Sequence, residues 1–216
     1  MARLRNETRV LHTGLERGPF MAAMLRGQLD LRAYCLYLRN LQAIYAALED
    51  AMVRHAADPL VAPVYMPALF RCAALEQDLN ALHGPTWACA LPLQPACYHY
   101  VERLQAVLAG DALLLVAHAY VRYLGDLSGG QMLKRIVAGS LQLEGGVGTA
   151  FYDFGDSRQV AALTFAFRDG LCQVSTDKEQ IGRIVAEALE AFELHRLLFQ
   201  QLDLARHLPC APPLIA

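Results

Sequence analysis

The 216-residue sequence contains no run of apolar residues long enough to cross a membrane. One of its longest uninterrupted apolar stretches, at 112–117, has six residues, whereas a membrane-spanning helix needs roughly 18 to 20. The N-terminus carries Arg3, Arg5 and Arg9 without the apolar segment that completes a secretory signal. We therefore expect neither a transmembrane helix nor a secretory leader.

Cysteine patterns and strong charge are also missing. The six cysteines form no CxxC or CxxCH motif, so we expect reduced thiols in a cytoplasmic protein. The formal net charge of −2 gives no global signal of a nucleic-acid partner. Apolar residues make up 55% of the chain and charged residues only 19%, which indicates a large core or an apolar pocket.

Strand signals and flexible linkers are nearly absent, and helical periodicity dominates. We predict one all-α domain over residues 1–216, with a core at about 3–205 and a short tail at 206–216. The pattern predicts an N-terminal helix that ends before Gly18 and Pro19, followed by a long amphipathic helix at 31–53. Further helices are expected at 69–82, 98–108, 111–138, 157–174 and 176–208, with loops at 87–95 and 145–155.

The helix expected at 111–138 contains Gly125, Gly129 and Gly130 within six residues. Each interior glycine costs about 1 kcal/mol relative to alanine, so the three together cost roughly 3 kcal/mol. Three interpretations stay open: a break between two helices, a phosphate-binding loop, or a kinked helix lying across a planar ligand. The phosphate interpretation is the weakest, because the segment lacks a GK[ST] ending and no strand precedes it.

Asp126 lies inside the same segment, next to leucines at 124, 127 and 133. A carboxylate in apolar surroundings is costly unless it is hydrogen-bonded. Placed beside a ligand, such a group orders water and relays protons, which favours the third interpretation.

His12 and Glu16 are four residues apart and so share one helical face. Imidazole is a common axial ligand of heme iron, and a carboxylate often holds the second ring nitrogen. The pair is also commonplace on solvated helices, so alone it leaves both interpretations open. The other histidines, including His118 and His195, are interpreted as structural.

Two segments resemble the classical heme oxygenase family. TRVLHTGLE (residues 8–16) is similar to the proximal helix of that family, and YLGDLSGGQMLKRI (residues 123–136) is similar to its distal-helix signature. Shorter similar stretches extend the resemblance over residues 3–205. It implies an all-helical fold in which heme lies between a proximal N-terminal helix and a kinked glycine-rich distal helix.

The resemblance implies roles for individual residues. His12 would be the axial ligand of heme b and Glu16 its hydrogen-bond partner, while Gly125 and Gly129 would meet the other face of heme. Asp126 would anchor a distal water network, helped by Arg122 and Tyr45. That network would deliver protons to bound O2 so that the ring is opened to biliverdin, ferrous iron and CO.

The propionates of heme require cations and hydrogen-bond donors. By resemblance these are Arg5, Tyr120 and Arg168. Thr164 departs from the family, which often has a lysine there, so the in-plane seating of heme and the biliverdin isomer stay undetermined. Phe192 and Phe199 are expected either to line the pocket or to belong to the helical core.

The resemblance also implies partners. Electrons would come from a ferredoxin or a flavoprotein reductase. Arg103, Lys134 and Arg135 are either a docking surface for this electron donor or ordinary solvated charges.

The chain ends in LARHLPCAPPLIA, so we expect a form without a membrane anchor. The alternative function is a non-catalytic heme-binding protein that stores or senses heme.

Overall fold

In a computed structural model, which describes residues 2–208, helices pack around one cluster of buried side chains. The predicted tail beyond residue 208 lies outside the described residues. The helices, in chain order, are α1 (Ala2–Arg17), α2 (Pro19–Leu25), α3 (Leu31–Arg54), α4 (Cys72–His83), α5 (Trp87–Ala90), α6 (Pro95–Ala109), α7 (Leu115–Ser140), α8 (Ser157–Gln173) and α9 (Lys178–Arg206). Short 3-10 turns are η1 (Ala62–Val64), η2 (Pro67–Leu69), η3 (Ala112–Leu114) and η4 (Ala150–Tyr152). No strand occurs in the described part of the chain, as the sequence predicts.

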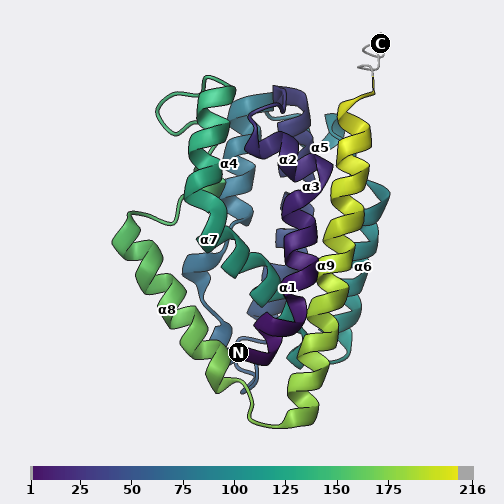
Figure 1. The fold of residues 1–216 in the computed structure, drawn as a ribbon, viewed down its shortest axis with the longest axis vertical. Coiled ribbons are helices and arrows are strands. Elements are labelled where there is room, and N and C mark those ends of the chain that lie inside the picture. The colour runs from purple at the N-terminus through teal and green to yellow at the C-terminus, as the bar shows by residue number, and fades with distance from the viewer. Residues whose placement is uncertain (1, 209–216) are drawn as a thin grey trace.

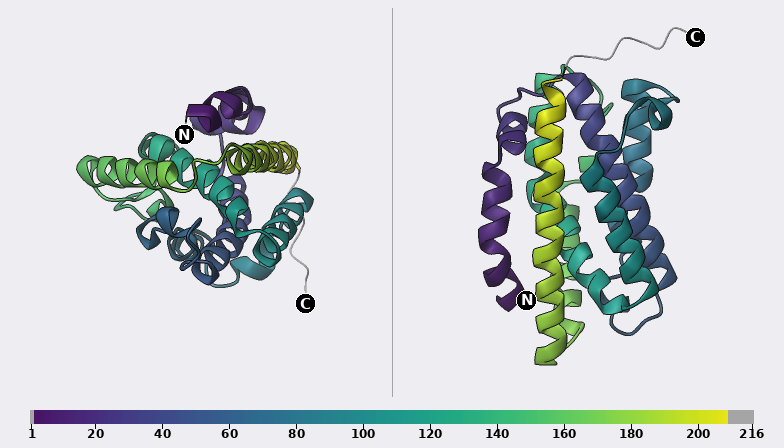
Figure 2. Two further views of the ribbon diagram at one scale, coloured as in Figure 1. Left: turned by 90° about the horizontal axis from the view of Figure 1, so that it is seen from below. Right: turned by 90° about the vertical axis from the view of Figure 1, so that its right-hand side faces the viewer.

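The long helix α9 is the centre of the packing. It contacts α1, α2, α3, α6 and α7, and Figures 1 and 2 show α1 lying alongside it at the surface of the bundle. The second layer is formed by α3, α4 and α6. Because α1 is held chiefly by α9 and α2, a space is left on its other side, toward α7 and α8.

Helix α7 runs without interruption through all three glycines. The interpretation of this segment as a break between two helices is therefore wrong. Figure 1 shows the axis of α7 bending near its middle, as the kinked-helix interpretation requires. Its first predicted turn, 112–114, forms the separate 3-10 turn η3 instead.

Two short helices were not predicted. The seven-residue α2 begins at Pro19, and the four-residue α5 replaces part of the loop expected at 87–95. Both are too short to show a helical periodicity in the sequence. Proline is favoured in the first turn of a helix, because its missing N–H would have no partner there.

No helix within residues 2–208 combines the length and apolar character needed to span a membrane.

A buried polar cluster joins α6, α7 and α9. Glu187 is 5% exposed and accepts hydrogen bonds from His118 Nε2 (2.9 Å) and Arg103 Nε (2.8 Å). His118 is fully buried, and its Nδ1 lies 3.3 Å from the Tyr100 hydroxyl. Burial alone would raise the pKa of Glu187, but the hydrogen bonds from His118 and Arg103 lower it to about 2.

This cluster predicts a specific acid sensitivity. Because the folded-state pKa of Glu187 lies below its ordinary value of 4.5, its ionised form stabilises the fold at neutral pH, and that contribution is lost as the pH falls from 4.5 toward 2. The full shift corresponds to about 3 kcal/mol at most, less where solvent screens the partly exposed Arg103. Denaturant unfolding should show Glu187→Gln to be less stable than the wild type at pH 7, with a difference that shrinks between pH 4.5 and 2.

Glu102→Gln, at an exposed position on α6, is the control and should change the unfolding free energy little at any pH. A Glu187→Gln difference that stays constant from pH 7 to pH 2 would contradict the assignment.

Candidate functional site

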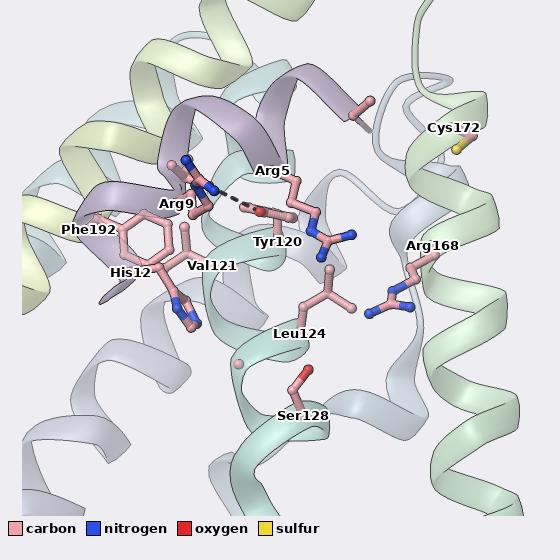
Figure 3. A pocket seen from close by; sticks show the side chains of 13 residues that line it. Arg5, Arg9, His12, Tyr120, Val121, Leu124, Ser128, Arg168, Cys172 and Phe192 are labelled. Atoms are coloured by element: carbon pink, nitrogen blue, oxygen red, sulfur yellow. Dashed lines mark hydrogen bonds between the residues drawn. The ribbon is translucent and has the colours of Figure 1, made fainter. Parts of the chain in front are cut away.

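A cavity of about 740 Å³ lies between α1, α7, α8 and α9, in the size range of small-molecule and cofactor sites. Apolar side chains share its walls with basic and hydroxyl-bearing side chains. Its lining residues include Arg5, Thr8, Arg9, His12, Tyr120, Val121, Leu124, Gly125, Ser128, Arg168 and Phe192. Figure 3 shows the side chains of His12 and Arg5 on α1 and of Leu124 and Ser128 on α7 around the space between these two helices.

Helix α1 supplies one wall. Residues 5, 8, 9 and 12 are spaced by three and four positions, so they share the helical face that meets the cavity. The helix is held in place by Leu4, which is buried, and by Thr8, whose hydroxyl lies 3.2 Å from the Tyr120 hydroxyl of α7. Arg9 was not predicted to belong to the site, although its spacing from Arg5 and His12 on one helical face is a usable signal.

The imidazole of His12 extends from α1 toward α7 (Figure 3) and is half exposed. Its ring meets the ring of Phe192 edge to face, with centroids 6.0 Å apart. His12 Nδ1 lies 3.7 Å from Glu16 Oε2, a separation too long for a hydrogen bond but within range of an ion pair. Nδ1 thus faces Glu16, and Nε2 is the nitrogen left for a ligand.

The opposite wall is the bend of α7. A Cβ atom added at Gly125 or Gly129 would meet no protein atom within 4 Å, so these two glycines are not required by packing within the chain. Gly130 differs, because a Cβ there would lie 3.7 Å from the backbone oxygen of Tyr152. Two of the three glycines therefore present bare backbone to open space one helical turn apart.

The position of Tyr152 is in turn fixed by Asp78. The buried carboxylate of Asp78 on α4 accepts hydrogen bonds from the backbone N–H groups of Ala150 and Phe151, both at 2.8 Å. These bonds hold η4, and with it Tyr152, against Gly130. The close packing of Tyr152 against Gly130 is thus supported by a carboxylate 52 residues earlier in the chain than Gly130.

Asp126, Arg122 and Tyr45 form a connected group behind the glycine wall. Arg122 donates from Nη2 to Asp126 Oδ1 (3.0 Å) and from Nε to the Tyr45 hydroxyl (3.1 Å), and that hydroxyl donates to Asp126 Oδ2. Arg122 and Tyr45 are buried, and the Asp126 side chain is 9% exposed. None of the three lines the cavity directly, but Asp126 adjoins Gly125, which does.

The environment of Asp126 changes its acidity. Burial raises the pKa of Asp126 above its ordinary range, while the charge of Arg122 and the hydrogen bond from Tyr45 oppose that rise. A carboxyl group with a raised pKa takes up and releases a proton at a higher pH than a surface aspartate does. The arrangement therefore suits proton transfer next to the cavity.

Cations gather at the other end of the cavity. Figure 3 shows the guanidinium groups of Arg5 on α1 and Arg168 on α8 pointing toward each other, away from His12. Thr164, one turn before Arg168, does not line the cavity, and its hydroxyl donates to the Val160 carbonyl oxygen (2.7 Å). This end can bind anionic groups, and α8 contributes one arginine to it.

Other predicted residues lie elsewhere. Phe199, considered for the pocket, packs instead in the core against Phe20 and Tyr37, with centroids 5.6 and 6.2 Å apart. It lies seven residues after Phe192 on α9, but the cavity ends at Phe192.

The three cations considered for docking differ in their surroundings. Arg103 pairs with Glu187, and Lys134 donates to Asp153 (2.8 Å), while Arg135 is exposed. Two of the three charges are thus already compensated within the chain. A role for them in binding an electron donor stays a prediction.

His195 was interpreted as structural, but the structure places its Nε2 2.6 Å from Arg122 Nη1. The imidazole therefore belongs to the group around Asp126. No sequence spacing links positions 122 and 195, which lie on different helices, so only the packing of α7 on α9 brings them together.

Known proteins with similar sequences were found along most of the chain. A family model described as heme oxygenase matches residues 1–201. Heme oxygenase 2 of Synechocystis sp. is 39% identical over 207 residues, covering 93% of this chain and 82% of that protein. Human heme oxygenase 1 is 40% identical over 202 residues, covering 93% of this chain and 70% of that protein.

Solved structures agree with the sequence matches. The crystal structure of heme oxygenase-1 from Synechocystis sp. in complex with heme superposes with a TM-score of 0.89 at 35% identity, covering 95% of this chain and 92% of the other. Heme oxygenase-2 of the same organism, in complex with heme and NO, gives a TM-score of 0.91 at 36% identity, with 95% and 85% of the two chains covered. On the family model, the sequence identity and the shared fold together, this chain belongs to the heme oxygenase family.

Proposed function

We propose that this chain is a heme oxygenase that opens the ring of its substrate, heme b, with O2 and external electrons, releasing biliverdin, ferrous iron and CO. The observation that carries the proposal is the geometry of one cavity. A histidine with a free ring nitrogen projects from α1, and a carboxyl with a raised pKa lies behind the bare glycine backbone of α7.

The cavity matches three properties of heme: apolar faces, an iron that accepts an imidazole nitrogen, and a planar ring. A porphyrin is flat with apolar faces, and Val121, Leu124 and Phe192 supply apolar walls. Its iron accepts an imidazole nitrogen, which His12 offers. The open space above Gly125 and Gly129 leaves room for a planar ring close to the backbone.

His12 binds the iron through Nε2 in this proposal. Glu16 lies beside Nδ1 and so favours a proton there, which leaves Nε2 free to coordinate. The edge-on contact with Phe192 limits rotation of the imidazole. The three residues together would orient the ligand before heme arrives.

The propionates lie among the cations. Arg5, Arg9 and Arg168 line the cavity together with Tyr120, whose hydroxyl is oriented by Thr8. Two arginines come from α1 and one from α8, since Thr164 supplies no cation. The carboxylate groups of heme would therefore be held mainly by guanidinium groups, whose planar forks match a carboxylate.

Asp126 takes the role of proton relay. Ring opening by O2 consumes protons on the face of heme opposite His12, and ordered water between Asp126 and that face would deliver them. Arg122 and Tyr45 hold the two carboxyl oxygens, so the group cannot rotate away. A ferredoxin or a flavoprotein reductase would supply the electrons.

The proposal is tested by titrating the purified protein with hemin and then adding ascorbate or a reductase under air. We expect a Soret band that saturates at one heme per chain and then decays as biliverdin absorbance grows. A stable Soret band without decay would instead support a heme-storage or heme-sensing protein. No Soret shift at all would contradict heme as the ligand.

Removal of the proposed iron ligand should weaken heme binding. We expect His12→Ala to lower hemin affinity by about tenfold or more, because the iron loses its proposed protein ligand. His99→Ala, at an exposed position on α6, is the matched control and should bind hemin as the wild type does. Equal affinities for the two variants in the optical titration would exclude His12 as the ligand.

Neutralising Asp126 should separate binding from chemistry. Asp126→Asn keeps the size of the side chain, but its amide cannot exchange protons as a carboxyl group does. We therefore expect normal hemin affinity and a rate of biliverdin formation lowered by about a hundredfold. Asp50→Asn, an exposed surface change on α3, is the control. A normal rate of biliverdin formation by Asp126→Asn would rule out the relay.

A further inference from the structure

His195 is the least expected member of the group around Asp126. It lies on α9, is 2% exposed, and its Nε2 is 2.6 Å from Arg122 Nη1. A guanidinium group donates hydrogen bonds and accepts none. His195 Nε2 must therefore be the acceptor and carries no proton.

The second ring nitrogen agrees with this assignment. His195 Nδ1 lies 3.2 Å from the backbone oxygen of Ala191, one turn earlier on α9, and a carbonyl oxygen can only accept. The proton of the neutral imidazole is therefore on Nδ1. Burial, followed by the charge of Arg122, lowers the pKa of His195 well below its ordinary range, which keeps the ring neutral.

The ring is also fixed in orientation. Tyr100 meets it edge to face at a centroid distance of 4.9 Å, and Phe199 does so at 5.8 Å. These contacts explain why Phe199 belongs to the core and not to the cavity. The acceptor atom of His195 is thus held at a defined point next to α7.

Each nitrogen of the Arg122 guanidinium then has its own partner. Nε donates to Tyr45, Nη1 to His195 and Nη2 to Asp126, at 3.1, 2.6 and 3.0 Å. The guanidinium is planar and rigid, so fixing Nη1 fixes the direction in which Nη2 points. Without an acceptor at position 195, a buried donor would be left unsatisfied, and the group could turn to find another partner.

We propose that His195 is a positioning residue: its neutral imidazole accepts a hydrogen bond from Arg122 and thereby holds Asp126 in place for proton delivery. The inference rests on the proposed function, since it gives the Arg122–Asp126 pair its purpose. His195 touches neither the cavity nor the proposed iron ligand, and it acts only through Arg122.

The first test needs no heme. The two ring nitrogens of a neutral histidine have distinct 15N chemical shifts according to which carries the proton. In 15N-histidine-labelled protein, the signal of His195 is identified as the one that is lost in His195→Gln. We expect its chemical shifts to be those of an Nδ1–H tautomer and to stay constant between pH 5 and 8. An Nε2–H tautomer or a charged imidazole would overturn the assignment.

The second test separates positioning from folding. His195→Leu keeps an apolar volume without an acceptor, whereas the amide oxygen of His195→Gln can replace Nε2. With heme bound at one per chain, we expect biliverdin formation to fall about tenfold or more in His195→Leu and to recover most of the wild-type rate in His195→Gln. Hemin affinity should be the same in both.

Leu202→Val is the matched control, because it removes buried volume from the same helix without touching Arg122. We expect it to lower thermal stability but not the rate. A wild-type rate in His195→Leu, or an equal loss in His195→Leu and His195→Gln with affinity kept, would overturn the positioning role. If His195→Leu fails to fold, a wild-type rate of biliverdin formation in His195→Gln together with the Nδ1–H signal supports the positioning role. A lowered rate in His195→Gln counts against that role.

These outcomes are distinguishable from a failure of the proposed function. If the wild type binds heme but forms no biliverdin, the enzymatic proposal fails, while the 15N measurement still decides whether His195 accepts from Arg122. If the wild type forms biliverdin and all three variants do so equally, the enzymatic proposal stands and only the role of His195 is refuted.

Discussion

The buried guanidinium of Arg122 is the group on which the arrangement of the site depends. A charge taken out of water is tolerated only when it is paired and fully hydrogen-bonded, and Arg122 meets that condition through Asp126, Tyr45 and His195. These partners come from α7, α3 and α9, so satisfying one charge locks three helices together. The same constraint places the Asp126 carboxyl next to the bare backbone at Gly125, which is the position that the proposed proton relay requires.

Arg122 stabilises the fold, whereas the glycines of α7 destabilise it. They weaken α7 by about 1 kcal/mol each relative to alanine, and at Gly125 and Gly129 nothing within the chain fills the space that results. Helix α1 likewise rests on α9 and leaves its His12 face open to the cavity. In the proposed function, a planar ligand in contact with both helices would offset the cost of the glycines. Binding of heme should therefore stabilise this part of the fold more than the core formed by α3, α4 and α6.

The long helices could be predicted because their apolar periodicity extends over many turns. The boundaries of α3 are within one residue of the predicted 31–53, and α7 covers the predicted 111–138 apart from the first turn of that range and extends two residues beyond it, although a break at its glycines had stayed open. Helices α2 and α5 were not predicted, because a helix of two turns or fewer shows no clear apolar periodicity. Within the site, the spacing of His12 and Glu16 on one helix left their role open and the family resemblance singled them out, whereas the pairing of His195 with Arg122 depends on tertiary packing between α9 and α7. Phe199 illustrates the same limit, since seven residues of helical spacing did not reveal where the cavity ends.

The most direct test of this account is a crystal structure of the protein with heme bound. We expect the iron to be coordinated by His12 Nε2, the ring to lie between α1 and the Gly125–Gly129 backbone, and the propionates to lie among Arg5, Arg9 and Arg168. Ordered water should connect Asp126 to the face of the ring opposite His12. Iron coordinated by another residue, or a ring bound away from the glycine backbone, would contradict the central claim that this cavity is the catalytic site.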